Sequence, residues 1–178
     1  MKILNTGFTL VELIVVIAII GLLATIGVSS YNNILKESKY TKTRTEITEI
    51  VKMVKLGRDI SGKTLIEITG SGCSECACRN GQLQSASCAT TVQTAIGKIA
   101  TAANNVIDVS EISKDFWGNP YLLNENEGET PGVCNTDNIA SAGPDGIYYN
   151  ADDILYNIAT FKCNNTTAVP HHPNMNWK

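Results

Sequence analysis

An apolar run near the N-terminus limits the possible folds of this chain more than any other feature. No charged side chain occurs from Leu13 to Leu35, and a run of this length can cross a bilayer as a helix. Glu12 stands directly before the run, where an unpaired carboxylate in hydrocarbon would cost about 3 kcal/mol. The run therefore predicts a membrane-spanning helix, and Glu12 requires either a partner or access to water.

The same run could belong to a secretory signal peptide, which joins a basic stretch to about 7–15 apolar residues and a small-residue cleavage site. This run is longer than that, and no A-x-A site follows it. We therefore expect a retained single-pass span. Lys2 and the chain amine should keep the N-terminus in the cytoplasm and leave the C-terminal bulk outside.

Helical periodicity continues beyond the run. Apolar residues at i, i+3, i+4 and i+7 predict an amphipathic helix, and they are Ile47, Ile50, Val51 and Val54. Gly57 is the predicted helix end, so one helix should run from about Phe8 to Leu56. The basic residues between Lys36 and Arg58 alternate with acidic ones, which indicates a solvated helix face rather than a binding patch.

The stretch from Gly7 to Ala24, GFTLVELIVVIAIIGLLA, resembles the N-terminus of type IV pilins and of type II secretion pseudopilins. The resemblance implies that prepilin peptidase cleaves between Gly7 and Phe8 and that the new Phe8 amine is N-methylated. It also implies that Glu12, fifth in the mature chain, meets the Phe8 amine of a neighbouring subunit during assembly. The alternative is that Glu12 only extends to the lipid headgroups.

Six cysteines follow in the exported part, where an oxidising environment makes disulfides the first expectation. They are Cys73, Cys76, Cys78, Cys88, Cys134 and Cys163, and their 15 possible pairings stay open. The C-x2-C-x-C-x9-C cluster could instead hold zinc through four thiolates, although it lacks the second C-x2-C pair that is typical of zinc sites. A thioredoxin-like redox role for Cys73 and Cys76 is weaker, because no βαβ pattern surrounds them.

The rest of the chain predicts one more helix and a small sheet. One helical face should hold Val92, Ala95, Ile96, Ile99, Ala103 and Val106. A turn at Gly118–Pro120 precedes a short apolar strand, and further strands are expected at Asn138–Ala140 and Ile154–Phe161. The predicted fold class is α+β, a long N-terminal helix packed on a small antiparallel sheet in the manner of type IV pilins.

The stretch SAGPDGIYYNADDI, residues 141–154, places the carboxylates of Asp145, Asp152 and Asp153 in a glycine-containing loop. Calcium takes 6–8 oxygen ligands from carboxylates and backbone carbonyls, so the loop is a candidate calcium site. It does not match the EF-hand pattern. The alternative is a polar turn, rich in short side chains, that binds nothing.

This loop resembles the calcium-binding loop of the major pseudopilin of type II secretion, and DFWGNPY at residues 115–121 resembles the same subfamily. By position, the resemblance implies that Asp145, Asp152 and Asp153 supply side chains. It implies backbone carbonyls from Ala142 and Asn150 as further calcium ligands.

These features predict a leader (1–7), a transmembrane and assembly helix (8–35), its amphipathic continuation (36–57) and an exported head (58–178). Within the head lie a Cys-rich insertion (73–88), the calcium-type loop (141–154) and a flexible tail (164–178) that carries the adjacent His171 and His172. The net charge of −3 gives no case for a nucleic-acid partner, and no Ser-His-Asp arrangement suggests an enzyme.

The leading hypothesis is a structural subunit of a type II secretion pseudopilus, assembled from the inner membrane into a periplasmic filament that supports protein export. Its expected partners are further copies of itself, minor pseudopilins or pilins, prepilin peptidase and an inner-membrane assembly platform. The first alternative is a type IV pilin that forms a surface fibre for adhesion, twitching or DNA uptake. The second is a metal-binding or redox domain held by a prepilin anchor.

Overall fold

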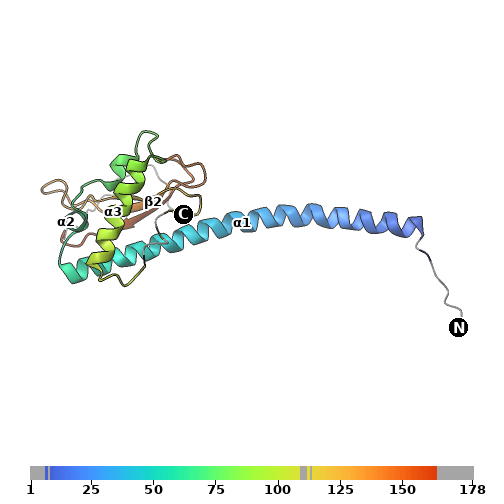
Figure 1. The fold of residues 1–178 in the computed structure, drawn as a ribbon, viewed down its shortest axis with the longest axis horizontal. Coiled ribbons are helices and arrows are strands. Elements are labelled where there is room, and N and C mark those ends of the chain that lie inside the picture. The colour runs from blue at the N-terminus through green and yellow to red at the C-terminus, as the bar shows by residue number, and fades with distance from the viewer. Residues whose placement is uncertain (1–6, 8, 109–111, 113, 164–178) are drawn as a thin grey trace. The chain divides into compact units, whose positions relative to one another are not determined.

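The computed structural model describes residues 7, 9–108, 112 and 114–163 of the 178-residue chain. Within that range the elements in chain order are α1 (Leu10–Ser61), α2 (Leu65–Thr69), the 3-10 helix η1 (Ser74–Cys78), α3 (Ala86–Ala102), β1 (Leu122–Asn124), β2 (Asp137–Ser141) and β3 (Ile154–Ile158) (Figure 1). The chain divides into two compact units, one ending at Lys39 and the other, called here the globular unit, starting at Tyr40. Residues of α1 belong to both.

Apolar side chains cover the part of α1 that belongs to the first unit. Their exposed fractions reach 74% at Leu10 and are still 40% at Leu35. By length and composition α1 can cross a membrane, with a mean hydropathy of 2.7 over its most apolar window. So much contiguous apolar surface needs lipid or other chains to cover it, as expected of the predicted membrane-spanning helix.

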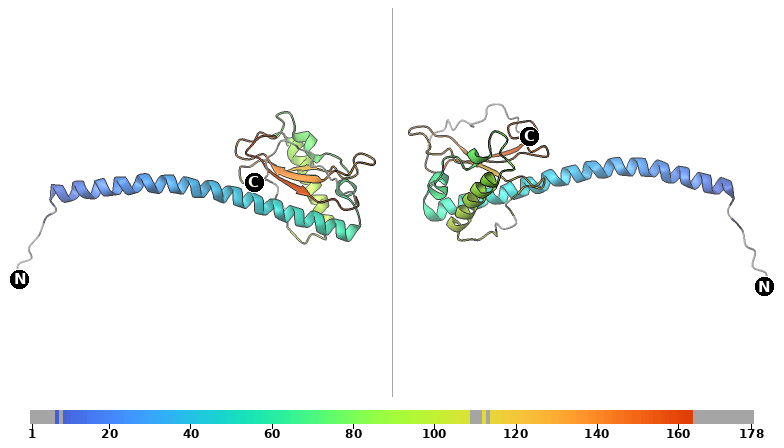
Figure 2. Two further views of the ribbon diagram at one scale, coloured as in Figure 1. Left: turned by 180° about the vertical axis from the view of Figure 1, so that it is seen from behind. Right: turned by 45° about the horizontal axis from the view of Figure 1, so that its top comes forward.

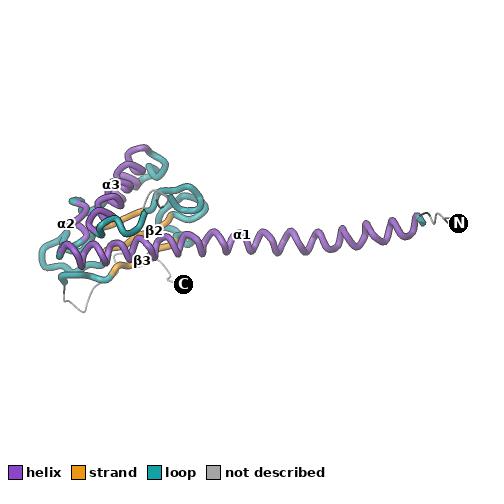
Figure 3. The backbone as a smooth tube through the Cα atoms, turned by 60° about the horizontal axis from the view of Figure 1, so that its bottom comes forward, coloured by secondary structure: helices purple, strands orange, loops and turns teal. Residues whose placement is uncertain are grey.

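The part of α1 in the globular unit packs into the hydrophobic core, as the periodicity predicted. Each residue of the predicted stripe is at most 2% exposed: Ile47, Ile50, Val51 and Val54. These residues join α3 and the strands in one cluster of buried side chains. Figures 2 and 3 show the last turns of α1 beside the sheet, with α3 contributing to the same core. The α+β fold class is confirmed.

Gly57 does not end α1, so that prediction was wrong. The helix continues to Ser61, and Gly62 follows it with a φ of +67°, the left-handed conformation common after helix ends. A Cβ atom added to Gly57 would lie 3.2 Å from the Cβ of Ala102 in α3. Gly57 therefore permits close approach of the two helices.

The predicted second helix is α3, and its buried face contains Val92, Ala95, Ile96 and Ile99. Ala103 is also buried, although it follows the last helical residue. Val106 is 68% exposed, so its place on the buried face was predicted wrongly. The reason is local: Asn104 and Asn105 adopt positive φ angles, which turn the chain away before Val106.

The sheet has the strand order β1-β2-β3 and is antiparallel throughout. Leu122 pairs with Ala140 in the first ladder, and Ser141 pairs with Ile154 in the second. β1 follows the predicted turn, and β2 extends one residue beyond each predicted end. β3 starts at the predicted Ile154 but stops at Ile158 rather than Phe161. Because Ser141 and Ile154 pair, the intervening loop of the candidate calcium site starts and ends at the same end of the β2–β3 hairpin.

Candidate functional site

Glu12 has a hydrogen-bonding partner within its own chain. Its carboxylate accepts a hydrogen bond from the backbone N–H of Thr9 at 2.8 Å and from the Thr9 hydroxyl at 2.7 Å. The Glu12 N–H donates back to the Thr9 hydroxyl oxygen at 3.3 Å. This reciprocal arrangement is a capping box, which satisfies free N–H groups at a helix start. The spacing Thr-x-x-Glu could have revealed it.

Other predicted features of the N- and C-termini lie outside the described residues. Phe8 and the leader residues before Gly7 belong to this group, and so does the tail with His171 and His172. Gly7 itself is exposed. Cleavage after Gly7, methylation of Phe8 and pairing of Phe8 with Glu12 therefore stay predictions.

All six cysteines form disulfides, as the exported setting suggested. The pairs are Cys73–Cys76, Cys78–Cys88 and Cys134–Cys163. The first closes around η1, the second joins η1 to α3, and the third ties the β1–β2 connection to the segment after β3. In this arrangement no thiolate of the Cys-rich segment is left to bind zinc.

The two motifs that resemble the major pseudopilin, residues 115–121 and 141–154, fold against each other. The Asp115 carboxylate accepts hydrogen bonds from the backbone of Trp117 and Asn119 at 2.9 and 2.8 Å, and from the Ser141 hydroxyl at 2.6 Å. The Asn119 side-chain amide donates to the Gly143 carbonyl at 3.0 Å. Burial raises the pKa of Asp115, while these donors oppose the shift. The turn at 115–121 therefore holds the first half of the 141–154 loop in place.

Gly143 is the position where this loop needs a glycine. Its φ is +64°, and an added Cβ would stand 2.6 Å from the backbone oxygen of Asp152. That separation is shorter than any real Cβ contact, and the obstructing atom is backbone, which cannot move aside cheaply. The absence of a side chain therefore lets the two ends of the loop close on each other.

The predicted calcium ligands lie in this closed loop, but three of the six carboxylate oxygens already accept hydrogen bonds. Asp145 accepts from the Ile147 N–H at 2.8 Å and from the Asn150 side-chain amide at 2.7 Å. Asp153 accepts from the backbone of Tyr149 at 2.7 Å and of Asn150 at 3.2 Å. Among the described residues, no three His, Cys, Asp or Glu side chains form a group able to hold a metal ion.

One feature of the loop nevertheless fits a cation. The Oδ1 atom of Asp153 is buried without a hydrogen-bond partner. Burial raises the pKa of Asp153 to about 6, and the charges of Asp152 and Asp145 add to the shift. The carboxylates thus repel one another in a partly buried loop, a repulsion that a bound cation would relieve. Ala142, a predicted carbonyl ligand, is fully buried at the start of the loop.

Sequence reasoning missed a buried network that joins this loop to the Cys-rich segment. Glu75 in η1 is fully buried, and its carboxylate accepts hydrogen bonds from Arg79 at 2.8 Å and from the hydroxyls of Tyr148 and Tyr149 at 3.1 and 3.2 Å. Burial, with the nearby Glu75 charge, raises the pKa of Tyr149 to about 12. The i,i+4 spacing of Glu75 and Arg79 was the available signal for the ion pair.

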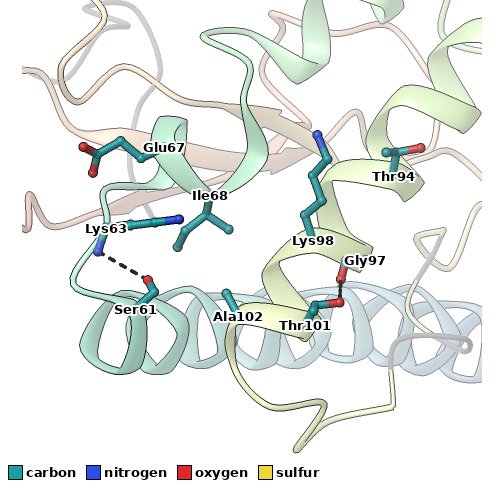
Figure 4. Close-up of a pocket in the computed structure, with 9 residues that line it drawn as sticks. All are labelled: Ser61, Lys63, Glu67, Ile68, Thr94, Gly97, Lys98, Thr101 and Ala102. Atoms are coloured by element: carbon teal, nitrogen blue, oxygen red, sulfur yellow. Dashed lines mark hydrogen bonds between the residues drawn. The ribbon is translucent and has the colours of Figure 1, made fainter.

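A cavity of about 630 Å³ lies between α2 and α3 (Figure 4). Its lining combines Ile68 and Ala102 with the basic side chains of Lys63 and Lys98. Glu67, also in the lining, forms an ion pair with the chain segment after β3. None of the residues predicted to be functional lines this cavity.

The comparisons with known proteins concern part of the chain. Residues 4–28 match the prokaryotic N-terminal methylation motif. One type IV major fimbrial protein FimA of Dichelobacter nodosus is 40% identical over 75 residues, covering 40% of this chain and 47% of the relative. Two more proteins of that name and organism are 46% identical over 46 residues, covering 26% of this chain and 30% or 29% of the relatives. No solved structure matches the chain significantly.

The chain thus matches less than half of the length of these relatives, all of which are named fimbrial proteins. None of the three names describes an enzyme or a secretion pseudopilin. The methylation motif overlaps the apolar part of α1 from Leu10 to residue 28, within the helix able to cross a membrane. The predicted resemblance to type IV pilins is therefore confirmed: the chain carries the N-terminal methylation motif, is similar to type IV fimbrial proteins over part of its length, and combines an N-terminal apolar helix with an α+β globular unit.

Proposed function

We propose that this protein is a structural subunit of a type IV pilus, a surface filament in which the apolar helices of many copies pack together. The observation that carries the proposal is the methylation motif at residues 4–28, continuous with an apolar helix surface that a single chain leaves exposed. The similarity to major fimbrial proteins favours this alternative over the secretion pseudopilus, the leading hypothesis from sequence.

In this proposal prepilin peptidase cleaves after Gly7, and the amine of Phe8 is then methylated. The partners are further copies of the chain, minor pilins and an inner-membrane assembly platform. Before assembly the subunit is held in the inner membrane with its globular unit outside the cytoplasm. It is then incorporated into a fibre that serves adhesion, twitching or DNA uptake. It acts as a building block, not as an enzyme.

The test is the location of the fibre. We expect cells that express the protein at its native level to release fibres containing it on shearing, and antibody against the globular unit to label fibres at the cell surface. A gene deletion should remove them, and complementation should restore them. A protein found only in the cell envelope, together with loss of secreted proteins in the deletion strain, would contradict the pilus and support the secretion pseudopilus.

A second proposal concerns the loop at 141–154, which we propose binds calcium through Asp145, Asp152 and Asp153, with carbonyls of Ala142 and Asn150. The support is the unpartnered Oδ1 of Asp153 and the partial burial of this carboxyl, which raises its pKa, with a further contribution from the charges of Asp152 and Asp145. Bound calcium would supply a positive charge that fastens the loop to the sheet edge. In exchange, the carboxylates would release some of their present N–H donors, including the side-chain amide of Asn150.

We expect chelation of calcium to lower the melting temperature of the full chain in detergent. Calcium at 100 times its dissociation constant contributes about 2.7 kcal/mol, or roughly 5–10 °C for a chain of this size. Asp153→Asn keeps a hydrogen-bond acceptor for the loop amides but should abolish the calcium dependence. The matched control Asp59→Asn removes an exposed charge from α1 and should leave it intact. Equal melting temperatures with calcium and with chelator would overturn the proposal.

The calcium effect should also depend on pH. Since the pKa of Asp153 is raised to about 6 in the calcium-free fold, this carboxyl binds a proton more tightly there than in the unfolded chain. Its contribution to stability is therefore present at low pH and is lost as pH rises through about 6. Calcium competes with that proton, so its stabilising effect should be larger at pH 7.5 than at pH 5.

A further inference from the structure

Aromatic side chains of the 115–121 turn lie against the first basic residues of the globular unit. The rings of Trp117 and Tyr40 meet edge to face with centroids 5.0 Å apart. Lys42 Nζ stands 5.4 Å from the ring centre of Phe116, and the Arg44 guanidinium lies 6.0 Å from the ring centre of Tyr40. These five residues are called the basic–aromatic patch below.

The patch is open to its surroundings, because Phe116 is 44% exposed and the side chain of Lys42 is 59% exposed. Part of its charge is balanced by Glu46, which lies 3.6 Å from Lys42. However, Glu46 is 14% exposed and also accepts a hydrogen bond from Tyr121 at 2.5 Å. The exposed surface of the patch is therefore formed mainly by cations and aromatic rings.

The patch begins close to the end of the apolar run in α1. Tyr40 is five residues beyond Leu35 and Arg44 nine, rises of about 7.5 Å and about 13.5 Å along a helix, so the long side chains of Lys42 and Arg44 must extend back toward the bilayer to reach its phosphates. The headgroup layer on each side of a bilayer is about 5–8 Å thick. Within residues 36–44, four basic side chains stand against one acidic side chain, although the whole chain has a net charge of −3. Positive charge is thus concentrated where the helix leaves the hydrocarbon.

We propose that the basic–aromatic patch binds anionic phospholipid headgroups at the surface of the membrane that α1 crosses. Lys42 and Arg44 attract the phosphate groups, and the rings of Tyr40, Phe116 and Trp117 occupy the interfacial layer that aromatic side chains prefer. The contact holds the globular unit of an unassembled subunit on the bilayer. From sequence alone this part of α1 was predicted to be an ordinary solvated helix face, because the sequence does not show that Phe116 and Trp117 pack against Tyr40 and Lys42.

Trp117 provides the probe for this contact, since the only other tryptophan of the chain is Trp177. The full chain carrying Trp177→Phe is reconstituted at low density in vesicles of phosphatidylcholine, with or without phosphatidylglycerol. Each vesicle also carries a lipid with a nitroxide on its headgroup. We expect quenching of Trp117 fluorescence to be about twofold stronger in the anionic vesicles at low salt. The difference should shrink when salt is raised from about 0.05 M to about 0.5 M.

The double variant K42Q/R44Q should reduce quenching in anionic vesicles to the level seen in phosphatidylcholine. The control K52Q/K55Q removes the same charge from exposed positions of α1 and should leave quenching unchanged. Equal quenching in both kinds of vesicle, or equal effects of the two double variants, would overturn the proposal. Quenching that follows protein density instead of lipid charge would also overturn it, because the patch would then contact another copy of the chain.

Discussion

Replacing Arg58 with methionine is expected to lower the free energy of unfolding of the globular unit by about 3–5 kcal/mol. Arg58 is 2% exposed, and its guanidinium donates to Asp137 and to the carbonyl of Ala159, the latter at 2.8 Å. Glu127 lies 3.6 Å from the same group. Methionine fills much of the volume but leaves two fully buried carboxylates, Asp137 and Glu127, without their cation.

These carboxylates organise much of the surrounding backbone. Asp137 accepts hydrogen bonds from the N–H groups of Asn126 and Glu127, both at 2.7 Å. Glu127 accepts from the backbone of Phe161, Lys162 and Cys163 at 2.6 to 3.0 Å. The network therefore connects α1, the β1–β2 connection and the segment after β3. Burial lowers the pKa of Arg58, but the ordinary value is so high that the group stays charged.

The measurement is the denaturant midpoint of the full chain in detergent, followed by near-ultraviolet circular dichroism. The control Lys55→Met makes the same exchange at an exposed position one turn earlier and should change stability by less than about 0.5 kcal/mol. Adding Asp137→Asn and Glu127→Gln to Arg58→Met should restore part of the loss, because neutral amides remove the uncompensated charge. An unchanged midpoint for Arg58→Met would show that the ion network does not stabilise the fold.

Arg58 also shows where prediction from sequence failed. The stripe at Ile47–Val54 and the buried face of α3 follow from local periodicity, and both were predicted correctly except for Val106. Arg58 was assigned to a solvated face because its neighbours in sequence are charged. Its actual partners lie 79 and 101 residues away in the chain, at Asp137 and Ala159. The position of Arg58 continues the buried stripe at i+4 from Val54, but nothing local in the sequence reveals the distant groups that pair with its charge.

The contact between the calcium-type loop and the 115–121 motif was not predicted, for the same reason. Each motif was visible, but the hydrogen bonds from Ser141 to Asp115 and from Asn119 to Gly143 join residues 26 and 24 positions apart. The Tyr149–Glu75 contact spans 74 positions and had no counterpart in the prediction. Local features, in contrast, can be predicted from sequence, because the Thr-x-x-Glu spacing at Thr9 and Glu12 is itself the signal for a helix cap.

Replacing Glu12 with alanine is expected to reduce the fibres recovered in shear fractions at least about tenfold. In the proposed filament this carboxylate neutralises the Phe8 amine of a neighbouring subunit. An unpaired charge in an apolar interface costs about 3 kcal/mol, more than the 1.4 kcal/mol that corresponds to a factor of ten. Loss of the helix cap is an alternative explanation for fewer fibres. Within the single chain Glu12 already caps α1 through Thr9, and loss of a cap alone costs about 1 kcal/mol.

Two further variants separate the charge of Glu12 from its capping role. Glu12→Gln keeps an oxygen that can accept from the Thr9 N–H but removes the charge, so it should lose fibres as alanine does. Thr9→Ala removes the hydroxyl that bonds to Glu12 while the charge remains, so it should retain most fibres. Membrane fractions would show equal amounts of each variant subunit, which excludes degradation as the cause. Fibres formed by Glu12→Gln at the wild-type level, with a loss in Thr9→Ala, would assign Glu12 to the helix cap and refute pairing between subunits.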